Sequence, residues 1–296
     1  MRIALLLPVF NKLNYTITCL SSLYDEISHN NLLDSFRIIL VDDGSTDGTG
    51  EYVKHHFPFV TVVKGDGNLW WSGGINKGAE HAINNLRVDY LLLWNNDITT
   101  HNHYFVNLLR LLQKPDKSTI FGSKIYMNYE NRTLWSMGGF IKPYIGKIGN
   151  IGYNKPDNHR FQQPLEVDWI PGMGTVIPVE VVHKIGYWDQ VNFPQYHGDL
   201  EYTYRAKING FKLIISPDLI LSNDTRNTAI GHEGSFKKLL GLLHDKRSLY
   251  NFHINTIFLK QYGKGPFKYL HLFVSYSVLM LSFLKWKCLR LLKTKS

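Results

Sequence analysis

The first hundred residues alternate between short apolar runs and segments in which apolar residues recur at helical spacing. The apolar runs have the length of buried strands and cover residues 3–9, 36–41, 59–63 and 89–94. The segment after the first run places apolar side chains on one helical face, at Ile17, Leu20, Leu23 and Ile27. This alternation predicts an α/β fold with a mainly parallel, Rossmann-like sheet and helices on both of its faces.

The pattern changes after about residue 115. Strand-like pieces, separated by glycine-rich turns, cover residues 119–126, 167–170 and 175–178. We expect them to extend the same sheet as a mixed part. From about residue 234 the spacing is helical to the end of the chain. The sequence therefore predicts one α/β domain over residues 1–228 and a helical extension over residues 229–296.

Acidic and amide side chains follow the second and fourth predicted strands. Asp42 and Asp43 end one strand, and Asn95, Asn96 and Asp97 end the other. Ligands of open α/β sheets bind outside the carboxyl ends of the strands, where both turns are expected. A carboxylate there can accept hydrogen bonds from a nucleobase or from ribose hydroxyls. A turn that caps the next helix explains Asp42 and Asp43 equally well.

The second of these turns suits a metal ion. Mg²⁺ and Mn²⁺ take oxygen ligands, commonly one carboxylate together with the oxygens of a diphosphate. Asp97 is the carboxylate of the triplet, beside Asn96. The alternative is an ordinary polar turn, in which Asn and Asp are common.

Two tryptophans stand before a pair of glycines at a predicted helix start, Trp70-Trp71-Ser72-Gly73-Gly74. This arrangement offers stacking surface and, at the helix start, free backbone N–H groups for a phosphate. The alternative is a tryptophan pair that packs under a loop.

Asp199 and Glu201 begin another predicted helix, after the aromatic and flexible segment Tyr196-His197-Gly198. Either carboxylate can act as a general base that takes a proton from an acceptor hydroxyl. A helix N-cap is the structural alternative, since carboxylates are stabilised at a helix start.

The net charge of +9 lies mostly in the tail after residue 263, which contains Lys and Arg but no Asp or Glu. The nearly neutral remainder argues against nucleic-acid binding. Two distant cysteines predict no disulfide framework and favour a cytoplasmic protein. The chain has no Walker A, complete GxGxxG, HExxH or GxSxG motif, so the enzyme classes that depend on these lose support.

Residues 269–284 form an apolar run with lysines on both sides, interrupted by His271 and three serines. The run is shorter than the ~20 residues that span a bilayer as a helix. We expect a helix that lies on the anionic inner surface of the cell membrane, as a peripheral anchor. A terminal helix packed on the body, or on a second subunit of a homo-oligomer, is the alternative.

The chain resembles the family 2 glycosyltransferases of the GT-A fold, and within them the bacterial polysaccharide branch with rhamnosyltransferases. The matching stretches occur in family order and comprise residues 7–11, 41–49, 67–78, 92–97, 172–175 and 197–201. Each stretch alone is weak evidence for the family, whereas the ordered set is specific to it.

The resemblance implies an inverting enzyme of cell-surface polysaccharide synthesis that uses a UDP- or dTDP-sugar and a saccharide or lipid-linked glycan acceptor. Asp43 would bind the base, Asp97 the divalent metal, and Asp199 or Glu201 would be the catalytic base. His232 would be a late metal ligand. The nucleotide and donor contacts would be Pro8, Phe10, Asn11, Asp42, Asp43, Asn68, Trp70, Trp71, Gly74, Asn76 and Asn96.

Two positions depart from the family pattern. Asn95 replaces the first acid of the metal motif, and Gly198 replaces the first acid of the pair at the base position. They leave open a second hypothesis, a catalytically silent GT-A domain that binds a glycan or an assembly partner at the membrane. A nucleotidyltransferase is disfavoured because the first strand is not followed by a glycine-rich, basic phosphate loop.

Overall fold

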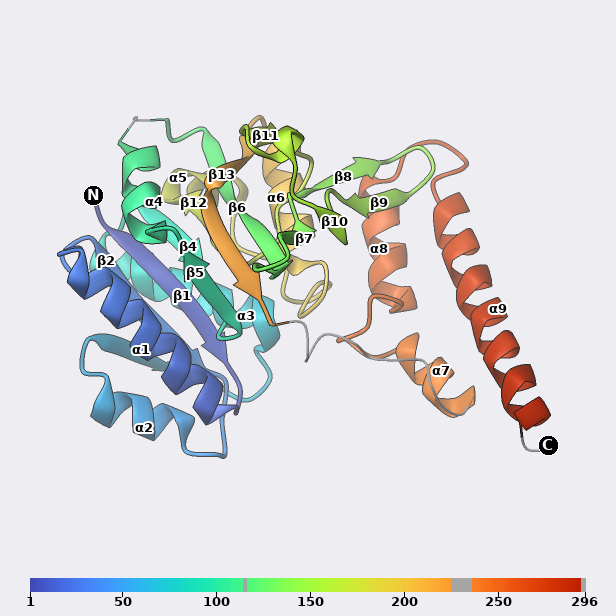
Figure 1. The fold of residues 1–296 in the computed structure, drawn as a ribbon, viewed down its shortest axis with the longest axis horizontal. Coiled ribbons are helices and arrows are strands. Elements are labelled where there is room, and N and C mark those ends of the chain that lie inside the picture. Colours follow the sequence, from blue (N-terminus) through green and yellow to red (C-terminus); the bar gives the residue numbers. More distant parts are fainter. Residues whose placement is uncertain (114–115, 225–235, 294–296) are drawn as a thin grey trace. The chain divides into compact units, whose positions relative to one another are not determined.

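A computed structural model describes residues 1–113, 116–224 and 236–293 (Figure 1). The chain divides into two compact units. The first unit comprises Met1–Phe140 and Asn150–Thr225, and the second comprises Ile141–Gly149 and Arg226–Ser296. The expected boundary between residues 228 and 229 lies outside the described residues.

The amino-terminal half of the first unit is a parallel sheet, as expected. Strand β1 (Ile3–Val9) lies between β2 (Phe36–Asp42) and β4 (Tyr90–Leu93), and β3 (Val60–Lys64) pairs with β2. Alternate side chains of β1 enter two different cores, Leu5 and Leu7 on one face and Leu6 on the other. Burial on both faces explains why β1 reads as a continuous apolar run.

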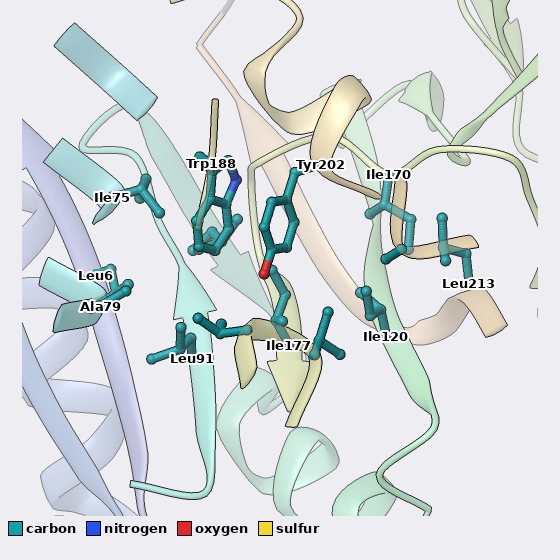
Figure 2. Packing of buried hydrophobic residues seen from close by; sticks show 14 of the residues in the cluster. Leu6, Ile75, Ala79, Leu91, Ile120, Ile170, Ile177, Trp188, Tyr202 and Leu213 are labelled. Carbon is teal, nitrogen blue, oxygen red and sulfur yellow. The ribbon is translucent and has the colours of Figure 1, made fainter. Parts of the chain in front are cut away.

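Helices cover both faces of this sheet. Residues of α1 (Leu13–His29), α2 (Thr49–His56) and α4 (Tyr104–Leu112) contribute to the core on one face. Residues of α3 (Trp70–His81), α5 (Val179–Ile185) and α6 (Gly198–Ile208) contribute to the core on the other. In that second core Trp188 stacks on Tyr202 with ring centroids 3.7 Å apart (Figure 2), which fixes α6 near α3. A π-helical turn, Ala82–Leu86, follows α3.

The remaining strands make the sheet mixed, also as expected. Strand β12 (Thr175–Pro178) is antiparallel to β4, and the long strand β13 (Lys212–Asn223) pairs with β6 and β5. The other elements are β5 (Ile98–His101), β6 (Thr119–Asn128), β7 (Thr133–Ser136), β10 (Lys155–Pro156), β11 (Leu165–Glu166) and the short helix His159–Phe161.

The strand predicted over residues 167–170 is wrong. Its backbone N–H groups donate to three unrelated partners instead of one neighbouring strand. Val167 donates to the carbonyl of Leu213, Asp168 to that of Gly139, and Ile170 to the Thr203 hydroxyl. Only a single bridge between Trp169 and Gly139 forms, so apolar character here reflects burial and not strand pairing.

The second unit is mostly helical. It contains α7 (Phe236–Leu242), α8 (Phe252–Tyr262) and α9 (Leu270–Lys293), as the sequence predicts for this region. The hairpin of β8 (Gly139–Lys142) and β9 (Lys147–Asn150) contributes residues 141–149. Backbone N–H groups of Lys264 and His271 donate to carbonyls in the turn of this hairpin. Within the described part of the chain, no helix is both long and apolar enough to span a bilayer.

Candidate functional site

Asp43 lies at the carboxyl edge of the sheet, where the sequence predicts it. Its side chain is only 6% exposed. One carboxylate oxygen accepts the N–H of Gly67 at 2.9 Å, and the other accepts that of Trp70 at 3.0 Å. Asp43 therefore holds the loop that leads into α3. Each oxygen has a further lone pair that can accept a hydrogen bond from a base or a ribose. The role of Asp43 in donor binding stays a prediction.

The neighbouring loops close around the end of β1. Asp42 accepts the N–H of Ser45, and Asn11 accepts that of Thr46 while its own N–H donates to the Ser45 hydroxyl. Pro8 packs against Gly74, where an added Cβ would lie 2.7 Å from the Cβ of the proline. Phe10 is 58% exposed beside this edge and offers an open aromatic face.

The expectation of free backbone N–H groups at the start of α3 is wrong. The helix begins at Trp70, so both tryptophans are inside it. Their N–H groups donate to the Asp43 carboxylate and the Gln195 side chain. Those of Ser72 and Gly73 donate to the carbonyls of Pro194 and Leu69. Distant segments therefore satisfy the N–H groups of Trp70, Trp71 and Ser72, and Gly73 makes an ordinary helical bond.

Trp71 links the two carboxylate regions of the predicted site. Its indole N–H donates to the side-chain oxygen of Asn95 at 3.2 Å. Its ring also packs on Gly172 so closely that a Cβ there would overlap it. The N–H of Gly172 in turn donates to Asp199 at 2.8 Å. The half-buried Trp71 side chain therefore contacts both Asn95 of the predicted metal motif and the glycine whose N–H positions Asp199.

Asn76 and Asn68 occupy different environments. Asn76 is buried; its amide donates to the carbonyl of Trp188 and the side chain of Gln190, and its oxygen accepts the N–H of Trp188. These bonds anchor the segment after α5 to α3. Asn68 is exposed in the loop before α3. A contact of either residue with the donor stays a prediction.

Asp97 ends the predicted metal motif. Its Oδ1 atom is buried and has no hydrogen-bond partner among the described residues. Burial is the main cause that raises the pKa of this carboxyl, and the nearby charge of Asp224 raises it further. The backbone N–H of Asp224 donates to the carbonyl of Asp97 at 2.9 Å. The charge of Lys12 acts in the opposite direction and lowers this pKa. An orphan carboxylate oxygen beside a second carboxylate suits a hard divalent cation.

The rest of the predicted metal set is less complete. Asn96 donates its amide to the Thr16 hydroxyl at 3.1 Å. In residues 1–113, 116–224 and 236–293, no three His, Cys, Asp or Glu side chains come close enough together to hold a metal ion by themselves. His232 lies outside the described residues. A cation at Asp97 would therefore depend on oxygens of the donor as well.

Asp199 lies in the first turn of α6, in a partly buried position beside Trp71. Its two oxygens accept the N–H groups of Gly172 and Leu200, each at 2.8 Å. Burial nevertheless raises the pKa of the carboxyl above its ordinary value. A carboxylate that is fixed in position and more basic than usual is suited to accept a proton.

Glu201 has a different environment. Its side chain is buried and forms an ion pair with Arg205, with N–O distances of 2.8 and 3.2 Å. Arg205 also donates to the carbonyl of Tyr187. A buried pair of this kind is held for structure, because breaking it leaves a charge uncompensated. The structure therefore favours Asp199 over Glu201 as the base, and the assignment stays a prediction.

Sequence reasoning missed the roles of Gly172 and Asp224. Gly172 was noted only as part of a glycine-rich turn, although its N–H orients Asp199. Asp224 follows the apolar strand β13, and a carboxylate directly after a buried strand is the same signal that identified Asp97. The apolar pattern of residues 212–223 carries this signal in the sequence.

The chain was compared with known proteins. The model of glycosyl transferase family 2 matches residues 4–171. A curated relative, the low-salt glycan biosynthesis hexosyltransferase Agl10 of Haloferax volcanii, is 24% identical over 181 residues. The alignment covers 58% of this chain and 53% of the relative, so the chain spans about half the length of that protein.

Solved structures share the fold at low sequence identity. The mannosyltransferase PcManGT from Pyrobaculum calidifontis, in complex with GDP-Man and Mn²⁺, has a TM-score of 0.58 at 15% identity, over 95% of this chain and 70% of its own. GalNAc-T7 with UDP, GalNAc and Mn²⁺ has a TM-score of 0.58 at 13% identity, over 94% and 57%. S. aureus TarS has a TM-score of 0.52 at 12% identity, over 75% and 36%. These likenesses show the GT-A fold.

Proposed function

The chain belongs to glycosyl transferase family 2, and we propose that it transfers a sugar from a nucleotide diphosphate donor to a saccharide or lipid-linked glycan acceptor, with inversion. The observation that carries this proposal is the position of Trp71. It contacts Asn95 of the metal motif and Gly172, whose N–H holds Asp199. A candidate base and a candidate cation-binding carboxylate are thus built around one aromatic side chain.

The relatives support the class of donor. Agl10 is a hexosyltransferase, and two of the similar structures are complexes with GDP-Man or UDP together with Mn²⁺. We propose a nucleotide-sugar donor and a divalent cation, Mg²⁺ or Mn²⁺, for this chain also. A UDP- or dTDP-sugar and a role in cell-surface polysaccharide synthesis are the finer form of the proposal.

In this reaction Asp199 takes the proton of the attacking acceptor hydroxyl. The new bond forms between that oxygen and the anomeric carbon, and the bond from the anomeric carbon to the diphosphate breaks. The Gly172 and Leu200 N–H groups keep the Asp199 carboxylate oriented, and the Trp71 ring packs against Gly172. A divalent cation, when bound at Asp97, would offset the charge on the departing diphosphate.

Both departures from the family pattern have a packing explanation. Asn95 accepts the indole N–H of Trp71 through its amide oxygen. At Gly198, any Cβ would overlap the Ser72 hydroxyl, which itself donates to the carbonyl of Phe193 at 2.6 Å. Each departure is thus accommodated by the packing of the site, and this supports an enzyme over a silent binding domain.

The proposed function is tested by release of nucleoside diphosphate. The purified chain is incubated with Mn²⁺, an acceptor extract and a panel of UDP-, GDP- and dTDP-sugars. We expect release with one base only, dependent on the acceptor. A folded protein that binds glycan but releases no nucleoside diphosphate from any donor would support the silent domain instead.

The pH profile should report the environment of Asp199. Because burial raises the pKa of its carboxyl, the residue is protonated at pH values where an ordinary Asp is ionised. We expect kcat to fall with falling pH at a midpoint above the ordinary Asp value of about 4. Initial rates at saturating donor, with circular dichroism to confirm folding at each pH, measure it. A midpoint at or below that value would remove the argument from burial.

We also propose that the second unit attaches the protein to the inner face of the cell membrane. Helix α9 exposes an apolar stripe that includes Phe273 (71% exposed) and Leu281 (64% exposed), with Lys285 and Lys287 after it. An apolar pocket of about 580 Å³ between α7, α8 and α9 adds to this surface. Exposed apolar surface beside basic residues suits an anionic bilayer.

Sedimentation with vesicles tests membrane binding. Replacing both Lys285 and Lys287 with Gln should weaken binding to vesicles with phosphatidylserine roughly 30-fold, at about 1 kcal/mol for each basic residue. Lys54→Gln, an exposed lysine of α2, serves as the control and should change nothing. Concentration-dependent dimerisation without vesicle binding would point to a subunit interface on this surface.

A further inference from the structure

Two of the three polar side chains in the predicted metal motif form hydrogen bonds with other residues of the chain. The side-chain oxygen of Asn95 accepts the Trp71 indole N–H, and the amide of Asn96 donates to Thr16. Asp97 is then the carboxylate of the motif, with a buried Oδ1 atom that has no partner among the described residues. A single carboxylate compensates only half the charge of a divalent cation.

A second carboxylate, Asp224, stands opposite Asp97 at the end of the neighbouring strand. In the antiparallel pairing of β13 with β5, Asn223 stands opposite Ile98. The next pair along this register is Asp224 and Asp97, joined by the bond from the Asp224 N–H to the Asp97 carbonyl. Side chains of directly opposed residues lie on the same face, with Cβ atoms ~4.5–5.5 Å apart. Both carboxylates therefore face the same side of the ladder.

The start of α1 borders this pair. The Tyr15 hydroxyl donates to Oδ2 of Asp224 at 3.4 Å, a long hydrogen bond. Lys12 lies nearby, with its ammonium 5.2 Å from the Tyr15 ring. Like charges directly opposed on a sheet are unfavourable unless something compensates them. The single positive charge of Lys12 offsets one of the two carboxylates at most. A divalent cation between the two carboxylates would compensate both.

We propose that Asp224 supplies the second carboxylate of the divalent-cation site, together with Asp97. This inference rests on the proposed function, because the cation is the one that accompanies the donor diphosphate. The strand end of β13 thereby replaces the acidic residue that the family pattern has at position 95. Two carboxylates on adjacent strands give Mg²⁺ or Mn²⁺ the hard oxygen ligands that these ions prefer.

The test is direct binding of Mn²⁺, followed by the electron paramagnetic resonance signal of the free ion. Asp224→Asn keeps the size and the backbone bond of the residue but removes its charge. We expect at least ~10-fold weaker Mn²⁺ binding, since changes even outside the innermost ligand shell cost ~10–100-fold. Asp224→His, which restores a ligand, should recover part of the loss.

Two further variants separate a ligand from a structural contact. Asp218→Asn makes the same change at an exposed position on β13 and should leave Mn²⁺ binding unchanged. Tyr15→Phe removes the hydroxyl that donates to Asp224. If Asp224 serves only to hold Tyr15, this variant will weaken Mn²⁺ binding as much as Asp224→Asn does, and the inference is overturned.

The outcomes distinguish this inference from the proposed function. If Asp97→Asn loses Mn²⁺ and Asp224→Asn binds it like the wild type, the metal site stands and the role of Asp224 fails. If the wild type binds no Mn²⁺, alone or with UDP or GDP, both the inference and the metal-dependent form of the function fail. Thermal unfolding of each variant identifies any that does not fold, and Asp224→Ala, which also removes the carboxylate, then replaces Asp224→Asn in the comparison.

Discussion

Replacing Asp199 with Asn should lower kcat by roughly 10²–10⁴, the range typical for loss of a general base. The amide has the same shape, and its oxygen can still accept the N–H of Gly172 or Leu200. It cannot take the proton of the acceptor hydroxyl. Donor binding should persist, because the change removes an interaction of the transition state only. Initial rates and a thermal shift with the donor measure the two effects.

Glu201→Gln distinguishes the two candidate bases. This change breaks the buried ion pair with Arg205, so we expect a clear drop in melting temperature. The folded protein should keep most of its kcat. A Glu201→Gln enzyme that is folded and inactive, beside an active Asp199→Asn enzyme, would assign the base to Glu201 instead.

Replacing Asp97 with Asn should abolish dependence on Mg²⁺ or Mn²⁺ and lower kcat by about 10²–10³. A cation contributes several kcal/mol to stabilising the charge of the transition state, and about 1.36 kcal/mol corresponds to a factor of ten in kcat. Activity measured over a Mn²⁺ titration, after removal of metal with EDTA, gives both values. A variant whose activity still rises with Mn²⁺ as in the wild type would place the cation elsewhere.

The stability of the same variant provides a control. Burial, together with the charge of Asp224, raises the pKa of the Asp97 carboxyl in the folded protein. The folded state therefore favours the protonated form. Ionisation of Asp97 destabilises the fold as pH rises from the ordinary Asp value to the raised pKa, and the loss is complete at neutral pH. In EDTA at neutral pH, Asp97→Asn should melt at the same or a higher temperature. A lost activity with unchanged or raised stability then points to the cation and not to misfolding.

Local patterns in the sequence are enough to predict the sheet and the edge on which the proposed site lies. The run from Ile3 to Val9 and the turns after Asp42 and Trp94 are local signals, since burial on both faces gives a continuous apolar strand and strand ends carry the polar residues. Helical spacing likewise predicted α1 and the helices of the second unit. These features depend on neighbours along the chain, which the sequence shows directly.

The contacts that these residues make depend on the tertiary fold. Trp71 meets Asn95, Gly172 and the region of Asp199, and Asp224 reaches Asp97 through the pairing of β13 with β5. Long-range hydrogen bonds also satisfy N–H groups at the start of α3 that the sequence predicts to be free. Periodicity reports which positions are buried but not which distant residue buries them. The partners of Trp71 and Asp97 are therefore set by how distant segments come together in the fold.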